Sequence, residues 1–209
     1  MRAAGFAGPI LFSPVLRIVP VAPGDLPEGT LVFTSRHAVL RATALGLADR
    51  PAVAVGDATA RSARLRGFAC DVGPGDAAGL VDFLLRRTTG PLLHLRGRHV
   101  TFDLTLAPRQ AGRAAADRVV YDQLDQPLTE AARRMLTEQS CLLPLYSPRS
   151  ARLVAGQLDP ARARPTVIAI SKAVAEAWPL PGPLHIAQVP NAAGMIARIG
   201  ALVAPDGER

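Results

Sequence analysis

The sequence contains few of the residues that build metal sites, disulfide frameworks and aromatic platforms. Of its 209 residues two are cysteines, four are histidines and only 4% are aromatic. Cys70 and Cys141 form no CxxC pair and have no histidine at ligand spacing, so the sequence indicates neither a disulfide framework nor a zinc site. We interpret both cysteines as small core hydrophobes and expect no metal centre.

Long apolar runs are also missing. Although 49% of the residues are hydrophobic, no uninterrupted run approaches the roughly 20 residues that a membrane helix requires. Residues 1–17 contain one early arginine and a short apolar stretch broken by two prolines, which makes a poor signal peptide. We therefore expect a soluble, cytoplasmic globular protein with no membrane partner, long enough for one large α/β domain or two small ones.

Lysine is almost absent, whereas arginine is abundant. The chain has 24 basic residues, of which only Lys172 is a lysine, against 17 acidic ones, for a net charge of +7. This balance favours an anionic partner, and the planar guanidinium suits carboxylate or phosphate. The arginines are dispersed and aromatics are scarce, which disfavours a nucleic-acid partner, and no GxGxxG or P-loop pattern indicates a nucleotide. A polyanionic small molecule accounts for the charge, as do solvated surface arginines.

The two halves of the chain resemble each other. The segment "LVFTSRHAVLRA" at 31–42 has a counterpart in "CLLPLYSPRSARLVA" at 141–155. Ser35 then corresponds to Ser147, Gly56 to Ser171, and the "AAGL" at 77–80 to the "AAGM" at 192–195, at offsets of 112 to 115 residues. A nearly constant offset predicts that the halves share one order of elements.

Within each half, short β-rich runs alternate with segments of helical apolar spacing, which predicts parallel sheets with right-handed crossovers. Ligands of such sheets bind beyond the carboxyl ends of the strands. Four strand-to-helix turns fall there, at 34–35, 56–59, 147–148 and 171–172. Free N–H groups at a helix start suit a carboxylate or phosphate, and a Ser or Thr hydroxyl either caps the helix or binds the anion. Capping alone explains any single turn, but four equivalent turns favour ligand binding.

Six short motifs, in order, resemble those of the uroporphyrinogen-III synthase family: "FTSRHAV", "AVGDATA", "LRG", "VVYDQL", "YSPRSA" and "AIS". The resemblance covers nearly the whole chain. It implies two flavodoxin-like parallel-sheet α/β domains joined by a two-stranded β linker, with one domain inserted in the other and the active-site cleft between them. Residues 15–21 and 118–124 would be the linker strands, 22–117 the inserted domain, and 1–14 with 125–209 the discontinuous domain.

The resemblance also implies a reaction. Members of the family close hydroxymethylbilane, a linear tetrapyrrole with eight carboxylates, to uroporphyrinogen III, inverting the last pyrrole ring and losing water. The product serves heme, siroheme, cobalamin and chlorophyll biosynthesis. For this chain the resemblance therefore implies a monomeric hydro-lyase that needs no cofactor and binds no nucleic acid.

The same resemblance suggests site residues. Tyr121 matches the tyrosine of the family's "VY" and is the candidate for donating a proton to the departing hydroxyl, with simple packing as the alternative. His37 is expected to be a surface residue, and Arg96 either binds a carboxylate or is a solvated charge at a strand end. The substrate-binding candidates share a place in or beside the motif turns: Thr34, Ser35, Arg36, Gly56, Thr59, Arg96, Ser147, Arg149, Ser150 and Ser171.

Two features depart from the family pattern. Family chains open with a strand ending in "TRP" and a full helix, whereas this sequence starts near that helix's end, at "RAAGFAG". We expect the discontinuous domain to lack that unit and to expose a sheet edge and apolar surface, through a late start codon or a shortened homologue. In "AISKAVA", Ser171 and Val174 replace the family's glycine and threonine. A degenerate, non-catalytic two-lobed protein that binds an anionic metabolite is therefore the alternative function.

Overall fold

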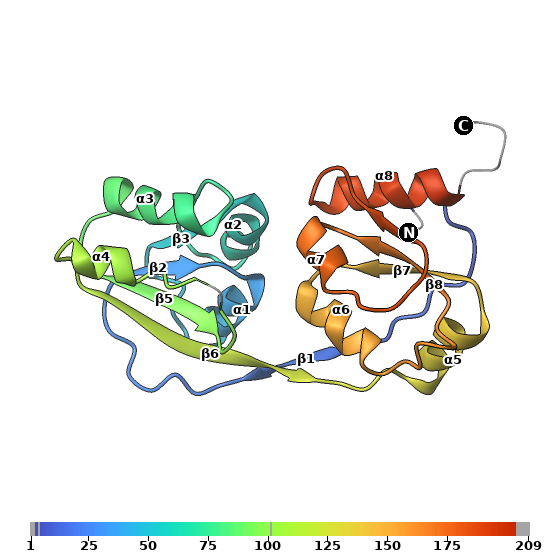
Figure 1. Ribbon diagram of the computed structural model, residues 1–209. Coiled ribbons are helices and arrows are strands. Elements are labelled where there is room, and N and C mark those ends of the chain that lie inside the picture. Colours follow the sequence, from blue (N-terminus) through green and yellow to red (C-terminus); the bar gives the residue numbers. More distant parts are fainter. Residues whose placement is uncertain (1–2, 4, 101, 204–209) are drawn as a thin grey trace. The chain divides into compact units, whose positions relative to one another are not determined.

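The computed structural model describes residue 3 and residues 5–100 and 102–203 (Figure 1). Parts of "RAAGFAG" and of the predicted discontinuous domain, namely residues 1–2, 4 and 204–209, lie outside the described residues. The chain divides into two compact units, Met1–Arg17 with Asp125–Arg209, and Ile18–Leu124. Each unit has its own mainly parallel sheet, so the predicted α/β class is confirmed. We call them the three-stranded unit and the six-stranded unit.

The six-stranded unit alternates strands with helices. Its elements, some of which extend past the unit boundary, are β1 (Leu16–Pro20), β2 (Thr30–Phe33), α1 (Arg36–Ala44), β3 (Ala52–Ala54), α2 (Asp57–Arg64), β4 (Cys70–Val72), α3 (Ala77–Arg87), β5 (Leu92–Gly97), α4 (Leu106–Gln110) and β6 (Ala115–Asp125). The strand order is β1-β6-β5-β2-β3-β4, and the pairs from β6 to β4 are all parallel.

This strand order corrects the predicted flavodoxin-like topology. Counted from β2, the parallel strands lie in the order 3-2-1-4-5, whereas a flavodoxin-like sheet has the order 2-1-3-4-5. Both orders arise from the same alternation of strands and right-handed crossover helices, so the periodicity of the sequence does not distinguish them.

The pairing of β1 with β6 is antiparallel. The Val21 N–H donates to the Val120 carbonyl at 3.0 Å, and the Gln126 N–H donates to the Val15 carbonyl at 2.9 Å. The residue numbers of the hydrogen-bonded pairs therefore rise along one segment and fall along the other, as in an antiparallel ladder. These strands overlap the two segments that the resemblance suggests as linker strands.

Helices cover both faces of the six-stranded sheet. Leu31 and Phe33 face the core beneath α1 and α2, while Val32 between them packs with Leu80 and Leu84 of α3 on the other face. Side chains of successive strand residues point to opposite faces, and here both sets are apolar and buried. Because this parallel sheet is packed on both faces, it is a rigid support for the loops at its strand ends.

The three-stranded unit repeats this design on a smaller scale. Its elements are α5 (Glu130–Glu138), β7 (Cys141–Leu145), α6 (Pro148–Ala155), β8 (Pro165–Ala169), α7 (Lys172–Glu176), β9 (Leu184–Ile186) and α8 (Ala192–Val203). The strands are parallel in the order β7-β8-β9, so β7 is an edge strand. Helices α5, α6 and α7 pack on one face, and α8 covers Ile168 on the other with Met195 and Ile199 (Figure 1).

The structure also shows the environment of the two cysteines and the apolar character of the helices. Cys70 is buried in the core of its unit, Cys141 is half-buried, and both are free thiols. Among residues 3, 5–100 and 102–203, no helix has the length and apolar character needed to cross a membrane. Within the same residues, no group of three or more His, Cys, Asp and Glu side chains is placed to hold a metal ion.

Candidate functional site

The carboxyl ends of the central strands gather several predicted residues at one edge of the six-stranded sheet. Phe33 is in register with Ala54 of β3 and with Leu95 of β5, so β2 and β3 end at the same level and β5 extends two residues further, to Gly97. Thr34 follows β2 directly, Gly56 follows β3 after one residue, and Gly97 is the last residue of β5. Across the next pair, Gly97 lies opposite Tyr121.

Tyr121 is held by backbone packing. The β5–β6 register shifts between Arg96 and Gly97, which brings Gly97 against the tyrosine ring. A methyl group on Gly97 would lie only 2.7 Å from the ring atoms Cε2 and Cζ. The side chain is 7% exposed, yet its hydroxyl makes no hydrogen bond with any other described residue. The ring is therefore held in place by Gly97.

Arg98 and His37 complete the surroundings of Tyr121. The Arg98 N–H donates to the Tyr121 carbonyl at 3.0 Å, and its Nε pairs with Asp122 Oδ2 at 2.7 Å. This hydrogen bond lowers the pKa of the Asp122 carboxyl. The His37 ring lies 5.6 Å from the Tyr121 ring between centroids, and burial, helped by the Arg36 charge, lowers the pKa of His37. His37 is thus half-buried beside Tyr121, not the surface residue that we expected.

Substitution of Gly97 by alanine tests this packing. The added methyl group must displace the Tyr121 ring or the strand, and such overpacking costs about 1–3 kcal/mol. We expect Gly97→Ala to lower the free energy of unfolding by that amount in urea titrations. In a Tyr121→Ala background the methyl group has room, so the same substitution should cost less than half as much. Equal costs in both backgrounds would show that the ring does not rest on Gly97.

His94 is a buried polar residue beneath the Thr34 turn. It lies in β5, is 3% exposed, and its Nε2 is 3.3 Å from the Thr34 Oγ1. Burial, with the nearby Arg96 charge, lowers the pKa of His94 to about 4, so the imidazole is neutral near pH 7. His94 is not among the residues predicted from the sequence, although a histidine inside the apolar run "LLHL" indicates a buried polar contact.

The turn serines act as helix caps. Ser35 Oγ accepts a hydrogen bond from the His37 N–H at 3.1 Å, and Ser147 Oγ accepts one from the Ser150 N–H at 3.0 Å. Ser147 also donates to Ser150 Oγ at 2.9 Å. Ser171 starts α7 without such a bond, and Gly56 starts α2 without a side chain. Capping therefore accounts for two turns, and the first N–H groups of α2 and α7 have no side-chain cap.

The caps predict that serine-to-alanine substitutions at equivalent turns differ in their effect on the stability of the protein. Removing a capping hydroxyl costs roughly 1 kcal/mol of stability. We expect Ser35→Ala and Ser147→Ala each to lower the urea midpoint accordingly. Ser171→Ala, which removes a hydroxyl at the equivalent place without a cap bond, should leave the midpoint within experimental error. A loss at Ser171 equal to the other two would contradict the assignment of caps.

The predicted arginines differ in their surroundings. Arg36 is exposed and makes no hydrogen bond or ion pair with another described residue. Arg96 donates from Nε to Asp117 Oδ2 at 2.6 Å and from Nη1 to the Gly97 carbonyl at 3.1 Å. Arg149 pairs with Asp125 Oδ1 at 2.6 Å. Arg96 is therefore an ion-paired residue that supports Gly97, and a role as carboxylate ligand stays a prediction for all three.

The remaining predicted residues lie at two strand-end edges, one in each unit. Half-buried Thr59 is in the first turn of α2, and its hydroxyl makes no hydrogen bond with other described residues. In the three-stranded unit, Leu145 and Ala169 are in register, so Ser147 and Ser171 follow β7 and β8 at the same edge. The structure thus places Thr34, Gly56, Thr59 and Tyr121 at one edge, and the serines at the corresponding edge of the repeat.

The structure defines the class as an α/β protein of two units, each with a mainly parallel sheet, and the larger unit has a fixed tyrosine ring at its strand ends. Residues 2–197 match the family model of "Uroporphyrinogen-III synthase HemD". The chain therefore belongs to the uroporphyrinogen-III synthase family, and the resemblance found in the sequence is confirmed.

A solved structure shows a similar fold. The chain is similar to the uroporphyrinogen-III synthetase from Helicobacter pylori 26695, with a TM-score of 0.69 and 18% identity over 90% of this chain and 91% of that one. A uroporphyrinogen III synthase from the extremely thermophilic bacterium Thermus thermophilus aligns with 20% identity over 82% of this chain and 76% of that one, at a TM-score of 0.40. No curated protein matches the chain.

Proposed function

We propose that this protein is a uroporphyrinogen-III synthase, a cofactor-independent hydro-lyase that closes hydroxymethylbilane to uroporphyrinogen III in tetrapyrrole biosynthesis. The observation that carries the proposal is Tyr121, whose ring is fixed against Gly97 while its hydroxyl has no partner among the described residues. Family membership over residues 2–197 supports this choice of reaction. The proposal includes the monomeric, cytoplasmic state expected from the sequence.

Tyr121 assists the departure of the substrate hydroxyl. The phenol donates its proton to that oxygen as the C–O bond breaks, so that the hydroxyl leaves as water. The N–H group of the same pyrrole gives up a proton, which restores the phenol, and the product is an azafulvene. The substituted carbon of the last pyrrole ring then attacks the azafulvene methylene to give a spiro intermediate. The bond from this carbon to the preceding methylene breaks, that methylene bonds instead to the unsubstituted carbon of the ring, which loses its proton, and the ring is thereby inverted. A phenol on a fixed ring needs little reorganisation before it acts, which is the advantage of a preorganised donor.

The turns bind the substrate carboxylates. In the six-stranded unit, the exposed Arg36 guanidinium and the uncapped N–H groups of α2 offer a cation and amide donors. Gly56 allows the close approach of the Gly75 backbone at the start of α2, since a methyl group there would lie 3.2 Å from the Gly75 Cα. The corresponding residues of the three-stranded unit are proposed as further ligands: Ser147, Arg149, Ser150 and Ser171.

Incubation with hydroxymethylbilane tests the proposal. After oxidation, the porphyrin isomers are separated by chromatography, since spontaneous closure yields isomer I. We expect isomer III with the native protein and isomer I alone with the heat-denatured protein. Isomer I alone with native protein, at concentrations where the substrate binds, would instead support the non-catalytic binder.

A further inference from the structure

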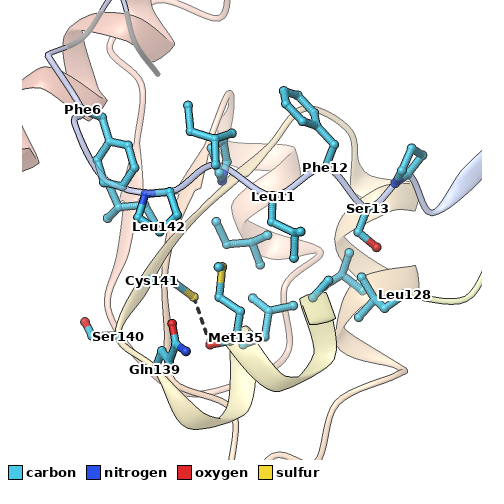
Figure 2. A pocket seen from close by; sticks show the side chains of 18 residues that line it. Phe6, Leu11, Phe12, Ser13, Leu128, Met135, Gln139, Ser140, Cys141 and Leu142 are labelled. Carbon is cyan, nitrogen blue, oxygen red and sulfur yellow. Dashed lines mark hydrogen bonds between the residues drawn. The ribbon is translucent and has the colours of Figure 1, made fainter. Parts of the chain in front are cut away.

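Carboxylates bind where charged and polar donors converge, and the two units differ in this respect. The cavity of about 540 Å³ in the three-stranded unit is lined mainly by apolar side chains, among them Leu11, Leu128 and Met135 (Figure 2). None of the described residues that line it is charged. The strand-end edge of the six-stranded unit, in contrast, has a buried histidine directly beneath a predicted ligand.

That histidine, His94, is a polar residue in an otherwise apolar strand. Its neighbours in β5, Leu93 and Leu95, are fully buried, and His94 itself is 3% exposed. A leucine would pack in the same layer without the cost of burying an imidazole. Thr105 is a second buried polar residue, but its hydroxyl donates to Asp103 Oδ1 within its own turn at 2.7 Å. His94 instead reaches across to another strand, so packing alone does not explain it.

His94 and Thr34 lie on the same face of the sheet. His94 is in register with Val32 of β2. Val32 packs with Leu80 and Leu84 of α3, and alternate residues of a strand share a face, so Thr34 continues the face of Val32. The His94 Nε2 is 3.3 Å from the Thr34 Oγ1. The imidazole therefore contacts the half-buried Thr34 hydroxyl from the side of the core.

Arg96 lies beside Thr34 at the same edge. Phe33 is in register with Leu95, and Thr34 and Arg96 are the residues that follow them. The Arg96 charge is close enough to add to the effect of burial in lowering the pKa of His94. Arg96 Nε donates to Asp117 Oδ2 at 2.6 Å, while no described residue accepts a hydrogen bond from its Nη2. A hydroxyl and a guanidinium are thus adjacent, and each contacts a second polar side chain.

We propose that His94 is a positioning residue for substrate binding by Thr34. The His94 Nε2–H group donates to the Thr34 Oγ1, so the hydroxyl proton of Thr34 points out of the core to a substrate carboxylate. The Arg96 guanidinium supplies the positive charge of the same subsite. This inference rests on the proposed function, because it assigns a further residue to the binding of the substrate carboxylates.

The direction of the hydrogen bond follows from what an anion requires. A hydroxyl has one proton and two acceptor lone pairs. If Thr34 donated to His94, its lone pairs would face the carboxylate and repel it. Burial lowers the pKa of His94 to about 4, so near pH 7 the ring is neutral and has one N–H group to donate. The ring therefore orients Thr34 without placing a second positive charge beside Arg96.

A double-mutant cycle tests whether His94 acts through Thr34. His94→Leu removes the donor and keeps an apolar side chain in the core, and Thr34→Val removes the hydroxyl. Each should raise the KM for hydroxymethylbilane about tenfold in the isomer III assay. The kcat should stay within about twofold, because a carboxylate remote from the reacting carbon is bound equally in the ground and transition states. In the Thr34→Val background, His94→Leu should add less than about twofold to KM.

Two further variants separate positioning from a structural role. His94→Gln places an amide N–H group near the Nε2 position and should keep KM within about twofold of the native value. His185→Leu is the matched control, a strand histidine of the other unit whose Nδ1 is 3.1 Å from Arg198 Nη2, and it should leave KM unchanged. A purely structural His94 would change the urea midpoint and leave KM at the native value.

The binding of uroporphyrin, a stable polycarboxylate tetrapyrrole, is measured by its fluorescence with the same variants. Native protein that binds uroporphyrin and forms no isomer III would refute the proposed function, and the dissociation constants, which should change as predicted for KM, would then decide the role of His94. A native KM for His94→Leu, an equal effect of His94→Leu with and without the Thr34 hydroxyl, or no rescue by His94→Gln would overturn the inference alone. Native protein that neither forms isomer III nor binds uroporphyrin would overturn both.

Discussion

Tyr121→Phe is expected to lower the rate of isomer III formation by about 100-fold, the low end of the range for general acid catalysis. The substitution removes only the hydroxyl and keeps the ring that packs against Gly97. Because that hydroxyl makes no hydrogen bond with described residues, the free energy of unfolding should stay within about 0.5 kcal/mol of the native value. The loss should therefore appear in kcat and not in stability.

The second tyrosine provides the control. Tyr146 is 58% exposed, and Tyr146→Phe removes an equal group away from the Gly97 contact. Initial rates of isomer III formation should be near those of the native protein for Tyr146→Phe and strongly reduced for Tyr121→Phe. A Tyr121→Phe variant with native kcat would assign Tyr121 to packing alone.

His94 is expected to make the six-stranded unit sensitive to acid. The pKa of His94 is about 4 in the folded protein and 6.5 for a free side chain, so between these values the unfolded chain binds a proton that the folded protein does not. The stabilisation is complete above pH 6.5 and disappears as the pH falls to 4. At 1.36 kcal/mol per pKa unit, the loss is about 3 kcal/mol.

His94→Gln isolates this effect, since an amide hydrogen-bonds Thr34 but does not titrate. Urea unfolding of both proteins at intervals between pH 7 and pH 4 gives the two stability profiles. The native protein should lose about 3 kcal/mol more than the variant across this range. Parallel profiles would mean that His94 is protonated in the folded protein or exposed to water.

Much of the fold follows from the sequence, because alternation of β-rich runs and helical spacing determines parallel α/β layers. The repeat centred on Ser35 and Ser147 appears in the structure as two strands that each end at a capped helix. The strand order could not be predicted from the sequence. It depends on which strand each new strand pairs with after its crossover helix, and local periodicity contains no information on that pairing.

The site was harder to predict because its geometry depends on long-range register. Tyr121 is fixed by a register shift between Arg96 and Gly97, and no local pattern encodes that shift. The ion pair of Arg96 with Asp117 likewise joins adjacent strands, and neither of the two sequence interpretations of Arg96, as a carboxylate ligand or as a solvated charge, included this partner. Sequence reasoning identified residue types suited to the turns, whereas their partners required the tertiary structure.

The rate of isomer III formation relative to isomer I is the most direct measurement of the central claim. Spontaneous closure to isomer I takes place in every reaction with hydroxymethylbilane, so its rate is an internal reference for the rate of isomer III formation. The account predicts that the ratio of isomer III to isomer I rises in proportion to the concentration of native protein, with a slope reduced about 100-fold by Tyr121→Phe. A ratio that stays at the value of buffer alone at every protein concentration would contradict it.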